Sequence, residues 1–158
     1  MKVSLDIGVS SRLWRGLPHA RAIARETIAA AVAESGAPLG EGAEASLRLA
    51  DDATLRALNA RWRGIDKPTN VLSFPAAPRG GATLGDIALA YETLAREAEE
   101  LGVPLADHYR HLVAHGFLHL IGYDHQTDAE AERMEALETR ILARLGAADP
   151  YARAVVGG

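Results

Sequence analysis

The chain has 158 residues, of which 48% are hydrophobic and 24% charged, so it is long enough for one folded domain with a substantial core. It contains no cysteine, which excludes disulfides and thiolate metal sites and leaves histidine and carboxylate side chains as metal ligands. The net charge of −4 argues against a protein that coats nucleic acid through its overall charge.

Apolar periodicity, helix caps and glycine or proline breaks predict four strands and five helices. Strands are expected at residues 2–7, around 45–49, at 70–74 and at 86–90. Helices are expected at residues 19–35, from 51 or 52 to 61 or 62, and at 92–101, 105–121 and 128–145. Residues 75–84 read as a loop, and Thr127 with Glu130 forms a capping box before the last helix. The order predicts an α+β (mixed α/β) fold in which about five helices cover a single four-stranded mixed sheet, within one domain over residues 1–158.

Three histidines at positions 115, 119 and 125 predict a metal site. His115 and His119 are four residues apart and therefore share one face of a helix. Gly122 allows the chain to turn after the helix and to bring His125 back toward the pair. Three imidazoles with the fourth position free are typical of catalytic zinc, where the pKa of bound water falls to about 7.

The spacing of these histidines also matches the long zinc-peptidase motif, with one difference. Those peptidases carry a glutamate directly after the first histidine as general base, and this chain has Gly116 there. The metal ligands of a peptidase are therefore present, but its base is absent.

The whole segment from His115 to His125 resembles the signature of the YbeY family, His-Gly-x-Leu-His-Leu-x-Gly-Tyr-Asp-His. An upstream segment, Leu58-Asn59 followed by Arg63 and by residues 66–75, is similar to a second motif of that family, with Trp62 where tyrosine is usual. Shorter matches lie at residues 84–87 and 145–151, so that the resemblance spans residues 45–151.

The resemblance implies a metal-dependent, single-strand-specific endoribonuclease that matures rRNA, including the 3′ end of 16S rRNA, and acts in ribosome quality control. It also implies a zincin-like metal helix beside the sheet and an important arginine at the position of Arg63. The expected cofactor is one divalent ion, assigned as Zn²⁺, although three imidazoles also accept nickel, cobalt or copper. The expected partners are single-stranded rRNA precursor and the ribosome or its proteins.

A basic island supports contact with RNA. Residues 53–85 contain five basic residues and one acidic residue, a net charge of +4, so the rest of the chain carries −8. Arg63 is the candidate catalytic residue because a guanidinium can bind two phosphate oxygens and stabilise the charge of a phosphoryl transition state. Arg61 and Lys67 are candidates for substrate binding. Trp62 and Phe74 could stack on bases, but core packing is the favoured role of Phe74.

Several polar residues near these motifs have open roles. His108 and His111 share the helix face of the histidine pair and are expected to line the site or form hydrogen bonds, not to bind metal. Asp124 could orient a ligand histidine or cap the turn. Asp86 could be a turn residue or a partner of a ligand.

Two other functions stay open: a zinc peptidase-like hydrolase, and a non-catalytic ribosome-assembly factor, which a fourth protein ligand on the metal would favour. The first residues lack the apolar core of a signal peptide, and no apolar run approaches the roughly 18 residues of a membrane span. A cytoplasmic protein without membrane contact is expected.

Overall fold

The computed structural model describes residues 3–76 and 81–151, so Lys2 of the first predicted strand, Arg79 of the basic island and part of the predicted loop at 75–84 lie outside the described residues. The strands are β1 (Ser4–Val9), β2 (Glu44–Ala50), β3 (Val71–Pro75) and β4 (Thr83–Ala90). The helices are α1 (Ala20–Ser35), α2 (Asp52–Arg63), α3 (Tyr91–Leu101), α4 (Leu105–Leu120) and α5 (Asp128–Arg144). The predicted α+β fold is confirmed.

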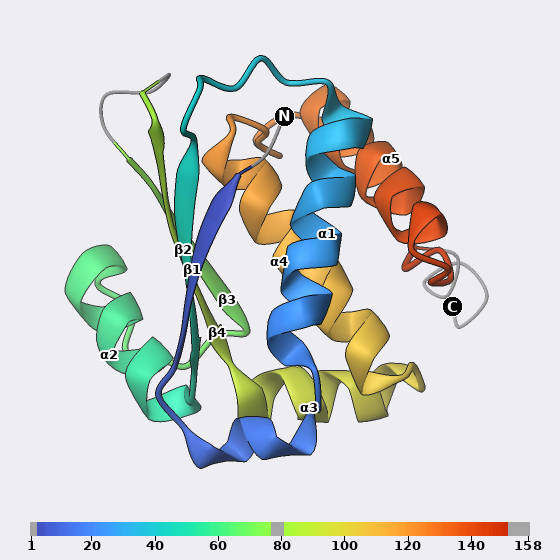
Figure 1. Cartoon of the computed structure of the whole chain (residues 1–158). Helices are drawn as coiled ribbons and strands as arrows, with labels where there is room; N and C mark the ends of the chain where they lie inside the picture. Colours follow the sequence, from blue (N-terminus) through green and yellow to red (C-terminus); the bar gives the residue numbers. More distant parts are fainter. Residues whose placement is uncertain (1–2, 77–80, 152–158) are drawn as a thin grey trace.

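The four strands form one mixed sheet in the order β1-β2-β4-β3. β1, β2 and β4 are parallel to one another, and β3 runs antiparallel to β4 at one edge. Figure 1 shows α2 alone on one side of this sheet, with α1, α4 and α5 on the other side. We call these sides the α2 face and the α4 face.

Strand alternation divides the side chains between the two faces. Leu47, Leu49, Ile87 and Leu89 point to the α4 face, where they are at most 1% exposed and form the main core with α1, α4 and α5. A smaller apolar cluster lies on the α2 face, where Leu55 of α2 packs against strand residues; its members are Ala50, Leu55, Leu72, Ala88 and Ala90. The α2 face is therefore only partly covered.

The structure departs from the predicted elements mainly at a 3-10 helix before α1 and at the start of β4, and β1 extends to Val9, two residues beyond its predicted end. A 3-10 helix, η1 (Arg12–Gly16), precedes α1 and buries Trp14, whose indole Nε1 donates to the Ala50 carbonyl at 2.7 Å. This tertiary contact has no periodic signal in the sequence. β4 begins at Thr83, three residues before its predicted start, because Thr83 and Gly85 pair with β2 around a register shift at Glu44.

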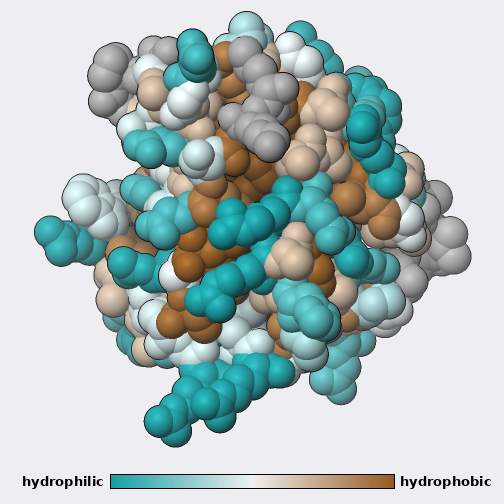
Figure 2. All heavy atoms as spheres, in the orientation of Figure 1, coloured by the Kyte–Doolittle hydropathy of each residue, from teal (hydrophilic) through white to brown (hydrophobic). Residues whose placement is uncertain are grey.

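The predicted caps of two helices are confirmed. The Asp51 carboxylate accepts from the Thr54 backbone N–H at the start of α2, and the Thr127 hydroxyl accepts from the Glu130 N–H at the start of α5. Hydrophilic and hydrophobic residues are intermixed on the face in view in Figure 2. Among the described helices, none combines the length and the apolar character that a membrane crossing requires.

Candidate metal centre

α4 carries the first two histidines of the predicted site side by side. The ring centroids of His115 and His119 are 4.6 Å apart, and their Nε2 atoms are 3.2 Å apart. Leu112, Val113, Phe117 and Leu118 on the same helix are at most 5% exposed, so the core fixes how the helix is rotated. Burial of the apolar stripe thus holds both imidazoles at one place on the surface of α4.

The turn after α4 returns the third histidine. Gly122 has φ of 107°, a conformation that glycine adopts without strain, and the next N–H, from Tyr123, donates to the Leu118 carbonyl at 3.0 Å. The ring centroid of His125 then lies 5.1 Å from that of His119 and 5.9 Å from that of His115. The three imidazoles converge, as the spacing and the glycine predict.

The Nδ1 atoms of both helical histidines already have acceptors. His119 Nδ1 lies 3.0 Å from the Tyr123 carbonyl oxygen, and His115 Nδ1 lies 3.3 Å from Glu138 Oε2. Because a carbonyl and a carboxylate only accept, each Nδ1 carries the proton and donates it. Each Nε2 therefore presents a lone pair, and the two lone pairs face each other.

Two facing lone pairs repel unless a cation lies between them. Two nitrogens that bind one tetrahedral zinc at about 2.0–2.1 Å lie roughly 3.3 Å apart, close to the 3.2 Å between these Nε2 atoms. The pKa of His119 is lowered, first by burial and then by the neighbouring charges of His115 and His125. The neutral imidazole that results is the form that binds metals, so these residues fit a divalent ion.

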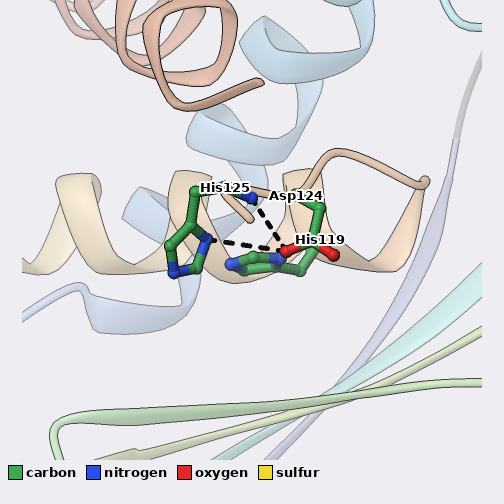
Figure 3. A group of neighbouring side chains, drawn as sticks. All are labelled: His119, Asp124 and His125. Carbon is green, nitrogen blue, oxygen red and sulfur yellow. Dashed lines mark hydrogen bonds and ion pairs between the residues drawn. The ribbon is translucent and has the colours of Figure 1, made fainter. Parts of the chain in front are cut away.

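Asp124 adds a carboxylate to the same place. One candidate ligand atom each from His119, Asp124 and His125 lies within 4.8 Å of the others, a group that could hold a metal ion. Figure 3 shows the Asp124 carboxylate beside both rings, with links to the backbone nitrogen of His125 at 2.8 Å and to its Nδ1 at 3.7 Å. Since Asp124 Oδ1 accepts from that backbone N–H, it shapes the turn that presents His125.

Glu138 of α5 is a residue of this site that sequence reasoning missed. Its carboxylate is 1% exposed and accepts from His111 Nε2 at 2.6 Å, the Tyr151 hydroxyl at 2.8 Å and His115 Nδ1 at 3.3 Å. Burial opposes the charged form, but the bonds from His111 and His115 outweigh it and lower the pKa of Glu138 to about 2. Glu138 is thus a carboxylate that orients a candidate ligand.

A signal for Glu138 exists in the sequence. The buried positions of α5 are Met134, Leu137, Glu138, Ile141 and Leu142, so the glutamate sits within the apolar stripe of an amphipathic helix. A carboxylate is almost never buried unless it is paired, and such a position therefore predicts a partner on another element. The partner itself could not be predicted from α5 alone.

The other two histidines of α4 point to carboxylates. His111 Nε2 is engaged by Glu138, and His108 Nε2 lies 2.9 Å from Glu97 Oε1, which also accepts from the Asn70 amide at 3.0 Å. Both rings thus form hydrogen bonds, one of the roles expected for them, while the prediction that neither binds metal stays a prediction. His111 instead helps to hold the glutamate that contacts His115.

Gly116 lies where α4 packs closely on β3 and β4. A Cβ atom at this position would lie 3.0 Å from Ile87 Cγ2, 3.1 Å from Ser73 Oγ and 3.3 Å from Val71 Cγ2. The Ser73 hydroxyl also donates to the Gly116 carbonyl at 3.1 Å. A peptidase-like glutamate would not fit at position 116 without a shift of helix or strand, because its side chain would point into β3 and β4.

Comparison with known proteins identifies the family. The family model described as endoribonuclease YbeY matches residues 16–146. The chain belongs to this family. The endoribonuclease YbeY of Methylocella silvestris is 52% identical over 153 residues, covering 96% of this chain and 87% of the relative. That of Bradyrhizobium sp. is 54% identical over 155 residues, covering 93% and 91%.

A solved structure supports the fold. The solution structure of TM1509 from Thermotoga maritima aligns with a TM-score of 0.55 and covers 90% of this chain and 91% of that protein. Only 21% of the aligned residues are identical, so this likeness concerns the fold alone. The resemblance to the YbeY family inferred from the motifs is confirmed by the family-model match and by the relatives at 52% and 54% identity.

The predicted arginine and its neighbours lie apart from the histidines. Arg63 is exposed at the end of α2, on the other face of the sheet from α4, and no hydrogen bond or ion pair joins it to another described residue. The buried Asn59 donates from its amide to the Lys67 carbonyl at 3.0 Å and so shapes the segment after α2. The roles of Arg61, Arg63 and Lys67 therefore stay predictions.

Asp86 does not approach the histidines either. Its side chain lies on the α2 face, where it accepts a hydrogen bond from the Ser46 hydroxyl of β2. Strand alternation separates it from Ile87, which contacts α4. Of the two roles left open for Asp86, the structure supports neither a turn residue nor a partner of the candidate ligands, because it lies within β4.

Replacing Glu138 with glutamine is expected to weaken zinc binding by about 10–100-fold, the usual cost of removing a carboxylate that orients a ligand. The glutamine amide would place its own N–H groups against His111 or His115, which already donate. Competition of the metal-free protein with a chromophoric chelator would measure the dissociation constant. Glu135→Gln on the exposed side of α5 is the control, and equal zinc affinity of the two variants would refute the role of Glu138.

Proposed function

We propose that this protein is a metal-dependent endoribonuclease that cuts single-stranded RNA during rRNA maturation. Its relatives at 52% and 54% identity carry the name endoribonuclease, and the candidate site has the ligands for a hydrolytic metal. The main observation in support is that the Nε2 atoms of His115 and His119 lie 3.2 Å apart, while the Nδ1 protons of both residues are donated to Glu138 and to the Tyr123 carbonyl.

In this proposal His115, His119 and His125 hold one Zn²⁺ ion. When bound, the ion supplies a Lewis acid for a phosphoryl oxygen and lowers the pKa of water at its free position. Glu138 and the Tyr123 carbonyl fix the tautomers of the two helical histidines, so that each Nε2 is ready to bind. Asp124 holds the turn that presents His125.

The wider setting rests on the family resemblance. We propose that the whole chain is one hydrolase domain that acts in the cytoplasm, that its substrate is rRNA precursor including the 3′ end of 16S rRNA, and that it contacts the ribosome or ribosomal proteins. Arg63 is proposed to stabilise the transition state, with Arg61 and Lys67 binding the substrate. A role in ribosome quality control belongs to the same proposal.

The two alternatives make different use of the site. A peptidase would need a base at Gly116, where a glutamate side chain would be crowded by Ile87 and Ser73. A non-catalytic assembly factor would need a closed metal site, and Asp124 is the neighbouring carboxylate that could close it. Against this, Asp124 Oδ1 is engaged by the His125 backbone N–H at 2.8 Å.

Cleavage of a labelled single-stranded RNA tests the proposed function. The zinc-loaded protein should cut the RNA, whereas the His115→Ala protein, purified in parallel, should not, because it lacks one Nε2 ligand. The same sequence in a duplex should resist cleavage. Equal cleavage by both proteins would reveal a contaminating ribonuclease, and an intact RNA with the zinc-loaded protein would favour the assembly factor.

A further inference from the structure

The α2 face of the sheet has a groove beyond the part that α2 covers. Its volume is about 650 Å³, and its lining includes Ser46, Arg48, Trp62, Phe74, Pro75 and Asp86. The outline of the molecule is indented at the left of Figure 2, on the side where Figure 1 shows α2. None of the candidate metal ligands lines this groove.

Trp62 is the main aromatic surface of the groove. It is 62% exposed, which is the largest value among the exposed large hydrophobic residues of the described chain. One neighbour of its ring is the half-buried Phe74, at 6.4 Å between centroids and 60° between planes. An indole of this size left open to solvent forgoes much of the free energy that its burial would provide, which is typical of a binding surface.

A cation lies over this ring. The Arg61 guanidinium carbon is 5.1 Å from the centroid of Trp62, within the range of a cation–π contact, and no ion pair with another described residue neutralises its charge. Arg48 of β2 adds a second exposed guanidinium to the lining. Arg48, Arg61 and the exposed Arg63 at the end of α2 give this face the chemistry of a polyanion site on a chain with a net charge of −4.

The groove also offers groups that can pair with the edge of a base. Asp86 provides a carboxylate acceptor, Arg48 provides donors, and the Ser46 hydroxyl lies between these two positions on β2 and β4. An aromatic platform with a cation beside it is how proteins hold unpaired bases without strong sequence preference. A protein partner could also pack on the Trp62 ring, but the excess of positive charge around the groove favours nucleic acid as the occupant.

We propose that this groove binds an unpaired base of single-stranded RNA, stacked on Trp62, with the flanking phosphate held by Arg61. The inference rests on the proposed function and extends it to a second contact with the substrate. β3 is the edge strand between the two sites: Ser73 and Phe74 both line the groove, and the Ser73 hydroxyl also donates to the Gly116 carbonyl of α4, next to His115. An RNA strand that reaches the metal can continue around this edge onto Trp62.

Binding of a short labelled single-stranded RNA to the metal-free full chain tests the proposal without cleavage. Trp62→Ala should weaken binding by about tenfold or more, since stacking on an aromatic ring supplies a large share of the affinity per base. Trp62→Phe should retain most of the affinity because a flat ring remains. Leu13→Ala removes another exposed hydrophobic residue, 43% exposed on η1, and should leave binding unchanged.

Tryptophan fluorescence provides a second measurement. Trp14 is 4% exposed and Trp62 is 62% exposed, so stacked RNA should quench the emission of the wild type and leave that of Trp62→Ala nearly unchanged. Unaltered RNA affinity in a Trp62→Ala protein with the wild-type melting temperature would overturn the proposal and leave a protein partner as the occupant. If the zinc-loaded wild type still cleaved RNA, the proposed function would stand although the groove proposal had failed. If RNA quenched the Trp62 emission but was not cleaved, the groove proposal would stand and the proposed function would be contradicted.

Discussion

Replacing His119 with alanine is expected to lower the bound zinc from about one ion per chain to nearly none. His119 is the central residue of the site, because its Nε2 lies 3.2 Å from that of His115 and its ring lies 5.1 Å from that of His125. A site with three protein ligands retains little affinity after the loss of the middle one. Elemental analysis of protein reloaded with zinc and then desalted would measure the effect, and RNA cleavage should disappear with the metal.

The control for this experiment is a histidine outside the site. His19 is exposed and has φ of 64°, a conformation that asparagine tolerates, so His19→Asn should retain zinc and activity. Stoichiometric zinc in the His119→Ala protein would show that the ion binds elsewhere. If the Asp124→Asn protein lost zinc and the His115→Ala protein retained it, the third ligand would be Asp124 and not His115.

Replacing Arg63 with alanine is expected to slow RNA turnover by about a hundredfold, equivalent to roughly 3 kcal/mol of transition-state stabilisation. Its guanidinium is exposed and unpaired among the described residues, so stability should change by only about 0.5 kcal/mol or less. Arg63→Lys should restore part of the rate, because a point charge cannot make the bidentate phosphate contact. Single-turnover cleavage, melting temperature and zinc content should be measured on one preparation.

Arg56 offers a matched control for Arg63 on the same helix. The Arg56 Nε donates to Asp66 Oδ1 at 2.7 Å in an exposed ion pair. Arg56→Ala therefore removes one positive charge from α2, as Arg63→Ala does, but the guanidinium that is lost was paired with a carboxylate. Equal turnover of the two variants would show that Arg63 contributes only through the overall positive charge of α2 and not through a specific contact with phosphate. Since Arg63 lies on the other face of the sheet from α4, a selective effect would mean that bound RNA reaches around β3.

Local sequence patterns predict the strands and the five α-helices, though not η1, and they predict the three converging histidines of the candidate site. Helical periodicity with the spacing of His115 and His119 places two imidazoles on one face, and Gly122 permits the turn that returns His125. These are local relations, because each depends on backbone geometry within about ten residues. Caps such as Asp51 and Thr127 were predictable for the same reason.

Contacts between residues far apart in the sequence follow from the chain topology and could not be predicted from local patterns. The strand order places β3 at an edge, and the pleat of β3 directs Ser73 to α4 and Phe74 to the α2 face. Because α2 packs on that second face, Arg63 and Trp62 lie away from the histidines. Packing of α5 on α4 brings Glu138 to His111 and His115, although 23 positions separate Glu138 from His115. Side-chain periodicity specifies the buried face of an element, but the neighbour that covers this face depends on chain topology and on the free energy of the complete core.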